Sequence, residues 1–360
     1  MTEPQDSETA TAARSIPGLV ATARRVVPLG LFQSMVAIVL GIVICFVIML
    51  FATADPLVAF QAFTLGTFRN AYSIGSMIAI ASILAVTAFA STVAFRAGAF
   101  NIGTEGQLVL GGLTAAIIAE KLPGPGGLVQ VIALLGAMAA GALWIAIPTV
   151  LRVRYRTNEI LTTLMANYIA ADLALFLVNQ YFRDKGSGAV ETPPLDESRW
   201  LLQILPPSAA NIGVVVALVL AGVLWLWFDR TRAGKRAEVS GLQPAFAEYL
   251  GIHSVSYLRN SMLISGALAG LGGGLAILGI SHAYIDGFSP QYGFLGITVA
   301  LIGRLRPVGV LVSALLYASL ITGATAMQAV SDVPYSLVFV LQGILILLIT
   351  SQRIGGRRTA

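Results

Sequence analysis

The chain has few charged residues for its length. Of its 360 residues, 11% are charged and 57% are hydrophobic, and the mean hydropathy is +0.84. A water-soluble domain typically carries about 25% charged residues, because its surface must stay hydrated. The shortage of charge argues against a soluble fold of this size. It predicts one membrane domain whose chain crosses the bilayer many times.

The sequence is also poor in residues that carry chemistry. Cys45 is the only cysteine, which excludes an intrachain disulfide, and His253 and His282 are the only histidines. They form no ligand pattern typical of a metal site, and no serine or cysteine nucleophile has an evident base beside it. The G-x-x-x-x-G-K-[ST] loop that cradles ATP phosphates is missing as well. We therefore expect no catalytic residues, no metal, no cofactor and no enzyme activity.

Long apolar runs occupy most of the chain. A helix needs about 20 mainly apolar residues to cross roughly 30 Å of hydrocarbon. Such runs predict an all-α polytopic membrane protein with about ten transmembrane helices. The expected limits are 28–51, 72–95, 102–119, 128–150, 158–181, 211–228, 258–280, 290–303, 307–328 and 334–351. The run at 290–303 is short for a crossing, so residues 290–328 form either two spans or a half-helix followed by a full span.

The basic residues alternate between loops. If the N-terminus is cytoplasmic, 17 of the 22 lysines and arginines fall on the cytoplasmic side, as the positive-inside rule requires. This predicts that both termini are cytoplasmic and explains most of the net charge of +5 without a nucleic-acid partner. We expect residues 1–25 to form a disordered cytoplasmic tail, 26–352 the transmembrane domain and 353–360 a second cytoplasmic tail.

The segment 95–107 (FRAGAFNIGTEGQ) interrupts the apolar pattern with polar residues and glycines. Asn101 is placed to cap the helix that follows, and Glu105 lies in its first turns, where the helix dipole favours a negative charge. One interpretation is a well-capped turn. The other is that Glu105 and Gln107 face a cavity or a partner, because ionisable groups at membrane depth are costly and usually functional. Asn167 lies deeper in a later span, where it lines a path or bonds to a neighbouring helix.

The longest cytoplasmic loop, 229–257, contains the segment 241–252 (GLQPAFAEYLGI). Pro244 suits the first position of a helix and Gly251 suits its C-terminal end. Phe246, Tyr249 and Leu250 follow at helical spacing and share one face. The pattern predicts a two-turn amphipathic helix, which either lies in the membrane interface or fits a groove on a cytoplasmic partner.

Three glycines, Gly266, Gly270 and Gly274, recur at four-residue spacing in the span 258–280. Small residues spaced in this way let membrane helices approach closely. We expect a packing surface here and assign it no chemistry.

These motifs together resemble a known family. The segments 95–107 and 157–170 (TNEILTTLMANYIA) are similar to two signatures of the integral membrane permeases of bacterial ABC importers. The branch is that of the branched-chain amino acid, simple-sugar and nucleoside systems, and the nucleoside-type group linked to basic membrane lipoproteins is the most similar. The segment 241–252 stands where these permeases carry a coupling helix. Segments 266–279 and 292–310 also follow the family pattern, so the resemblance covers roughly residues 28–351.

The resemblance implies a permease domain over residues 26–352 that moves a small polar solute, most simply a nucleoside, by alternating access across the bacterial cytoplasmic membrane. Its implied partners are two cytoplasmic ATP-binding subunits, a second permease subunit, an extracytoplasmic substrate-binding lipoprotein and membrane lipid. The residues expected to couple the chain to the ATPases are Pro244, Ala245, Phe246, Tyr249 and Gly251. Those expected to line the substrate path are Asn101, Glu105, Gln107 and Asn167. A simple-sugar permease and a stand-alone secondary transporter are the alternative functions.

Overall fold

The computed structural model of the protein describes residues 43–44, 46–51, 53–332, 340 and 343. The expected spans 28–51 and 334–351 lie largely outside these residues, as do both tails and Cys45. The chain divides into two compact units, and the unit Leu57–Val333 contains nearly all of the structure described below.

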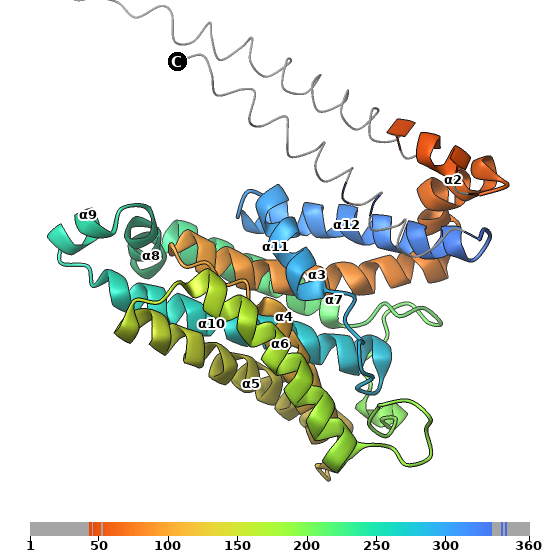
Figure 1. The fold of residues 1–360 in the computed structure, drawn as a ribbon, viewed down its shortest axis with the longest axis horizontal. Coiled ribbons are helices and arrows are strands. Elements are labelled where there is room, and N and C mark those ends of the chain that lie inside the picture. Colours follow the sequence, from red (N-terminus) through yellow and green to blue (C-terminus); the bar gives the residue numbers. More distant parts are fainter. Residues whose placement is uncertain (1–42, 45, 52, 333–339, 341–342, 344–360) are drawn as a thin grey trace, which may run out of the picture. The chain divides into compact units, whose positions relative to one another are not determined.

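The described residues form helices and no strand, apart from two isolated bridges (Figure 1). The α-helices are α2 (Pro56–Leu65), α3 (Ala71–Arg96), α4 (Thr104–Lys121), α5 (Gly126–Tyr155), α6 (Glu159–Leu177), α7 (Gly213–Arg230), α8 (Arg232–Leu242), α9 (Pro244–Tyr249), α10 (Ser254–Ala276), α11 (Tyr292–Ile302) and α12 (Pro307–Gln328). Short 3₁₀ or π turns are η1 (Gly66–Phe68), η2 (Val178–Phe182), η3 (Glu197–Arg199) and η4 (Ile277–Ser281).

Among the described residues, six helical segments are long and apolar enough to cross a membrane: α3, α5, α6 with η2, α7, α10 with η4, and α12. The prediction of an all-helical membrane protein is therefore confirmed. The region 290–328 consists of the 11-residue α11 followed by the 22-residue α12. Of the two expected arrangements, the half-helix followed by a full helix is the one that forms.

Helices α3 and α10 form the centre of this unit. Their apolar windows are 83% and 78% buried, against 28% for each of α5, α6 and α7. Both central helices are rich in alanine, glycine and serine, and these small side chains let several neighbours approach on all sides. The outer helices keep exposed leucine, valine and isoleucine side chains, as helices that face lipid do.

The glycine ridge of α10 packs against α5, as its spacing predicts. A Cβ atom on Gly266 or Gly270 would collide with the backbone of α5 at Gly141 and Ala137. On Gly274 it would lie 3.1 Å from the Ala137 Cβ atom. The ridge is therefore a helix–helix contact, and no polar group on it points to further chemistry.

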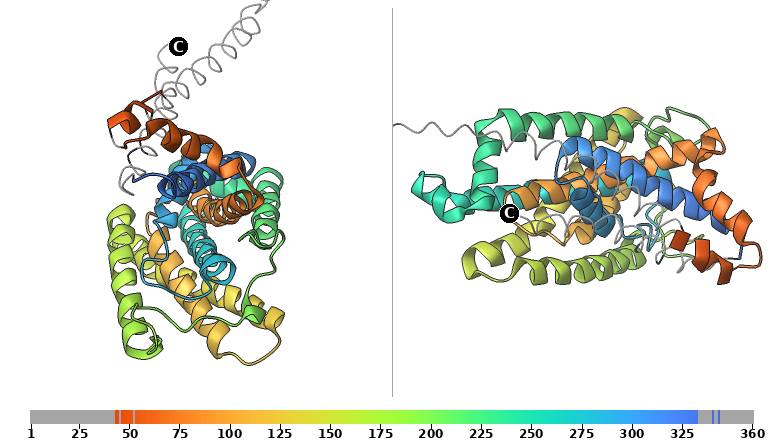
Figure 2. Two further views of the ribbon diagram at one scale, coloured as in Figure 1. Left: turned by 90° about the vertical axis from the view of Figure 1, so that its right-hand side faces the viewer. Right: turned by 90° about the horizontal axis from the view of Figure 1, so that it is seen from above.

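The two ends of the helical unit differ. Helices α8 and α9 project at one end, and α2 lies at the other (Figures 1 and 2). The long loop 182–210 covers the connection from α10 to α11 through backbone hydrogen bonds. Thr192 donates to the Tyr284 carbonyl at 2.9 Å and Leu195 to the His282 carbonyl at 2.8 Å. Trp200, from the same loop, stacks on His282 with ring centroids 3.8 Å apart.

Candidate functional site

Helix α9 is the expected short amphipathic helix. Pro244 occupies its first turn, and Gly251 follows its end with a φ of +73°, a backbone conformation that glycine adopts without strain. Phe246, Tyr249 and Leu250 are 50%, 87% and 54% exposed, respectively. Three large apolar side chains at this exposure favour a contact with another surface. The other face of α9 turns inward, with Ala247 fully buried and Glu248 accepting a hydrogen bond from the Ser254 hydroxyl at 2.8 Å.

Helix α8 attaches α9 to the end of α3. Arg96, the last residue of α3, donates a hydrogen bond to Glu238 of α8 at 2.9 Å, and the two side chains form an ion pair. The Arg96 guanidinium also lies 3.9 Å from the centroid of the Phe228 ring on α7, within cation–π range. One partly buried cation thus ties together α3, α7 and α8.

The joint between α3 and α8, where Arg96 meets Glu238, also contains a close contact between two backbones. A Cβ atom on Gly241, near the end of α8, would collide with the Arg96 carbonyl oxygen and lie 2.5 Å from the Gly98 nitrogen. A Cβ atom on Gly98 would lie 2.8 Å from the Gly241 Cα atom. Only glycines permit this approach, and Gly241 comes three residues before the start of α9. A displacement of α9 is therefore expected to reach the turn between α3 and α4 directly.

The ion pair of the joint is formed at neutral pH. Partial burial alone would raise the pKa of the Glu238 carboxyl, but the hydrogen bond and charge of Arg96, together with the charge of Lys235, hold it below its usual value of 4.5. Lys235 lies 3.6 Å from Glu238 and 4.0 Å from Asp229. Both carboxylates at this joint are thus matched by cations.

Three of the four residues predicted for the substrate path belong to one buried amide network. The Asn101 side-chain nitrogen donates to the Gln107 oxygen and to the Ser265 hydroxyl, each at 2.9 Å. Gln107 donates back to the Asn101 oxygen at 3.0 Å. Asn167 of α6 binds the same turn, because it accepts from the Gly106 amide and donates to the Ile102 carbonyl, each at 2.9 Å. The network joins the turn before α4 to α6 and α10.

The structure corrects the expected role of Asn101 as a helix cap. Helix α4 begins at Thr104, and its first turn has no side-chain cap. The Asn101 oxygen instead accepts from the Gly103 amide at 2.9 Å, closing a tight turn before the helix. Asparagine side chains bond readily to nearby backbone amides, so asparagine forms tight turns as well as helix caps. At Asn101 the tight turn forms.

Glu105, the fourth residue predicted for the path, lies apart from the amide network. Its carboxylate accepts from the Gly293 amide at 2.7 Å, at the start of α11. The neighbouring Thr104 hydroxyl donates to the Gly293 carbonyl at 3.0 Å. Two helix N-termini, those of α4 and α11, therefore meet at one carboxylate, where both helix dipoles favour a negative charge.

Sequence reasoning missed several residues that these contacts make important. Arg96 and Gly98 lie within the quoted segment 95–107, and Gly241 opens the segment 241–252, but the pattern gave no sign that the two segments touch. Glu238 and Ser265 had no local signal at all. Their roles depend on partners more than 140 positions away in the chain.

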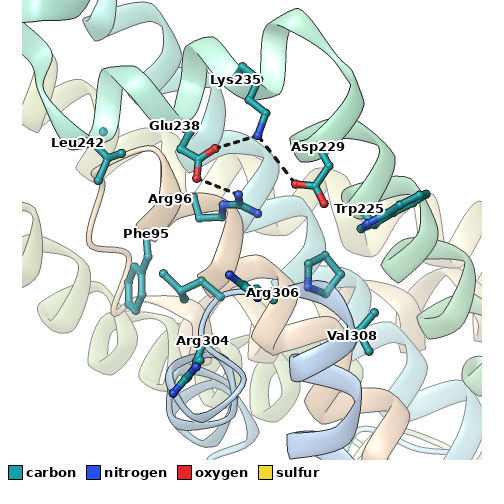
Figure 3. Close-up of a pocket in the computed structure, with 13 residues that line it drawn as sticks. Phe95, Arg96, Trp225, Asp229, Lys235, Glu238, Leu242, Arg304, Arg306 and Val308 are labelled. Carbon is teal, nitrogen blue, oxygen red and sulfur yellow. Dashed lines mark hydrogen bonds and ion pairs between the residues drawn. The ribbon is translucent and has the colours of Figure 1, made fainter. Parts of the chain in front are cut away.

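A cavity of about 710 Å³ opens beside the joint (Figure 3). The Arg96–Glu238–Lys235–Asp229 group forms one wall, and the turn that carries Arg304 and Arg306 lies opposite. Trp225, Leu242 and Val308 complete its edge.

Comparison with known proteins adds one family match and three similar proteins. A family model described as branched-chain amino acid transport system / permease component matches residues 73–350. The guanosine ABC transporter permease protein NupP of Bacillus subtilis (strain 168) is 33% identical over 324 residues, covering 89% of this chain and 93% of the relative. The nucleoside ABC transporter permease protein NupB of Lactococcus lactis subsp. cremoris (strain MG1363) is 31% identical, covering 81% and 83%. The glucose ABC transporter permease protein TsgB13 of Haloferax volcanii is 30% identical, covering 83% and 81%.

Proposed function

The chain belongs to the permease family of branched-chain amino acid transport systems, and from this premise we propose that it carries a nucleoside through an ABC importer. It is a permease subunit and a multi-pass protein of the cytoplasmic membrane, not itself an enzyme. Two of the relatives described above are named for guanosine or nucleoside transport and the third for glucose. A nucleoside is therefore the proposed substrate, and a simple sugar is the alternative.

The proposed mechanism rests on one observation, the exposed apolar face of α9. Phe246, Tyr249 and Leu250 are exposed on a helix that α8 fixes to the end of α3. An exposed apolar face of this kind is more stable when it is buried in a groove on a cytoplasmic ATP-binding subunit than when it is exposed to water. In the proposed mechanism, closure of two such subunits on ATP displaces α9, and the Gly98–Gly241 contact passes the movement to the turn before α4.

The proposed assembly contains two ATP-binding subunits, a second permease subunit and an extracytoplasmic substrate-binding lipoprotein. We propose about ten spans with both termini in the cytoplasm. The clustering of Arg96, Arg230, Arg304 and Arg306 near one end of the helical unit supports this orientation, because basic residues collect on the cytoplasmic side.

The proposed substrate path includes Asn101, Glu105, Gln107 and Asn167. Glu105 is the least buried of the four. The amide groups of the other three are occupied by one another and by the backbone. Any direct contact of these amides with a nucleoside therefore requires the turn before α4 to move, which is the movement proposed to follow from α9.

The first test is affinity purification of the tagged full chain from mild detergent, with partners identified by mass spectrometry. An ATPase with a phosphate-binding loop and a second permease are the expected partners. Proteoliposomes holding that complex and its binding protein should then take up labelled guanosine in an ATP-dependent way and exclude glucose. Uptake of glucose alone would replace the substrate assignment, and transport by the chain without any ATPase would overturn the importer proposal.

A further inference from the structure

The cavity beside the α3–α8 joint lies at a membrane surface. Three candidate spans reach it with their ends: α3 with Arg96, α7 with Trp225 and Asp229, and α12 with Pro307 and Val308. A cavity lined by the termini of spanning helices lies at the level of the lipid headgroups, because the helices themselves cross the hydrocarbon.

The charges around the cavity are unbalanced in favour of cations. Its lining holds four basic side chains and two carboxylates. Arg96 and Lys235 pair with both carboxylates, at distances of 2.9 to 4.0 Å. Arg304 and Arg306 remain, and within the described part of the chain neither forms an ion pair or a side-chain hydrogen bond. Two unmatched guanidinium groups on one short turn leave an excess of positive charge at the cavity, which favours an anion there.

The turn that carries these arginines lines the cavity. Arg304 and Leu305 both adopt left-handed backbone conformations, with φ values of +58° and +56°. The bend that results brings residues 304–308 to the cavity wall opposite Glu238 and Lys235 (Figure 3). A left-handed pair of non-glycine residues is uncommon, so the bend is a specific feature of this turn.

The edge of the cavity is apolar and exposed. Trp225 is 41% exposed, Val308 66% and Leu242 76%. Tryptophan is enriched at headgroup level in membrane proteins, and Arg230 stacks beside this one at 5.6 Å. An apolar edge adds nothing to the binding of a small soluble anion, whereas it provides a contact surface for the acyl chains of a phospholipid.

We propose that this cavity binds the phosphate-bearing headgroup of an anionic membrane lipid. Arg304 and Arg306 donate to the phosphate oxygens, and the acyl chains leave across Trp225 and Val308. Basic pockets between the cytoplasmic ends of membrane helices suit such headgroups. The site is separate from the exposed face of α9, and it requires membrane insertion but no particular transported substrate.

The test is native mass spectrometry of the full chain, purified in mild detergent and stripped of lipid. Dioleoyl phosphatidylglycerol is titrated back and compared with dioleoyl phosphatidylcholine and with inorganic phosphate as a competitor. Binding of phosphatidylglycerol should weaken roughly fivefold with R304Q or R306Q alone and about 25-fold with both. R154Q is the matched control, because Arg154 is an exposed arginine in the last turn of α5, away from the cavity.

Three results would overturn the assignment. Equal binding of phosphatidylglycerol by the wild type and by the R304Q/R306Q variant removes the cavity as a lipid site. Displacement of bound phosphatidylglycerol by millimolar inorganic phosphate, with no preference over phosphatidylcholine, identifies a soluble phosphate compound as the ligand. In the purified complex, loss of an ATPase subunit from R304Q/R306Q at unchanged lipid content would assign the arginines to a protein partner instead. Both arginines are exposed, so thermal unfolding of the variants should match the wild type.

Discussion

The carboxylate of Glu105 accepts a hydrogen bond from the backbone amide of Gly293 at 2.7 Å, so a residue in the first turn of α4 caps the first turn of α11. Helix α11 has only 11 residues, and its N-cap residue Gln291 makes no side-chain cap hydrogen bond. The Ser289 hydroxyl accepts from the Tyr292 amide at 3.0 Å, and Glu105 supplies the bond to the next amide. A Cβ atom on Gly293 would lie 2.5 Å from the Glu105 Cα atom. The half-helix is therefore positioned by α4 through a contact that needs both the carboxylate and the glycine.

This relationship predicts a graded effect at residue 105. Glu105→Ala removes the acceptor and should lower the free energy of unfolding by about 2 kcal/mol, as for the loss of a strong helix cap. Glu105→Gln keeps an oxygen at the same reach and should cost less than half as much. Equilibrium unfolding of the purified chain in mild detergent, followed by circular dichroism, measures both.

Uptake by the assembled transporter separates capping from contact with substrate. If the carboxylate only caps α11, Glu105→Gln should keep most of the uptake rate. If Glu105→Gln unfolds like the wild type but transports nothing, the charge itself belongs to the substrate path. Glu120→Gln at the far end of α4 is the control, because within the described part of the chain the one ion pair of Glu120 is with its neighbour Lys121.

The contact between Gly98 and Gly241 gives a second prediction. Gly241→Ala places a methyl group against the backbone of Arg96 and Gly98, so it should force α8 away from α3. We expect loss of substrate-stimulated ATP hydrolysis in the complex and a fall of 1–3 kcal/mol or so in stability, typical of overpacking. Gly222→Ala in α7 is the control, because nothing lies within 4 Å of its Cβ position. There alanine should be neutral or slightly stabilising, and a similar loss of coupling in both variants would contradict the proposed contact.

Most of the helices could be predicted from the sequence because each depends on its own residues. The apolar run at 307–328 predicts α12 without error. Pro244 and Gly251 bracket α9 because they act on the backbone within one helical turn. The brevity of α11 was also visible, since too few apolar residues precede the turn at Gly303.

The contacts between segments could not be predicted in the same way. Arg96 reads as one more positive-inside residue until the structure places Glu238 and Phe228 beside it. Asn101 has the sequence context of a helix cap, but Gln107 and Ser265 bind its side-chain nitrogen and the Gly103 amide binds its oxygen. Such choices depend on which distant groups compete for one amide, and neither spacing nor periodicity contains that information.

A third prediction concerns the exposed face of α9. The variant Phe246→Ala with Tyr249→Ala removes two side chains that are 50% and 87% exposed, so the chain should still fold and insert. Because these side chains are proposed to fill a groove on the ATP-binding subunit, transport and its coupled ATP hydrolysis should be abolished. The readout is ATP hydrolysis by proteoliposomes with and without substrate-loaded binding protein.

The control for this variant is Tyr155→Ala, which removes an aromatic residue that is 64% exposed at the end of α5. It should leave coupling unchanged. If the double variant on α9 couples normally, that helix lies in the membrane interface and has no part in transmission.

The partial burial of His282, on which Trp200 stacks, makes stability depend on pH. Partial burial lowers the pKa of the His282 imidazole below its usual value of 6.5, against a smaller opposing effect of a hydrogen bond with Leu278. A lowered pKa means that the unfolded chain binds more protons between the two values, so the free energy of unfolding rises with pH there. The stabilisation is complete above pH 6.5 and is lost as the pH falls through the pKa of the folded state. The unfolding midpoint should therefore drop between pH 7.5 and pH 5.5, a window above the usual range of carboxylates.

His282→Gln should flatten this dependence, while His253→Gln, on the exposed turn before α10, should preserve it. A midpoint in the His282 variant that falls as steeply as in the wild type would place the titrating group elsewhere.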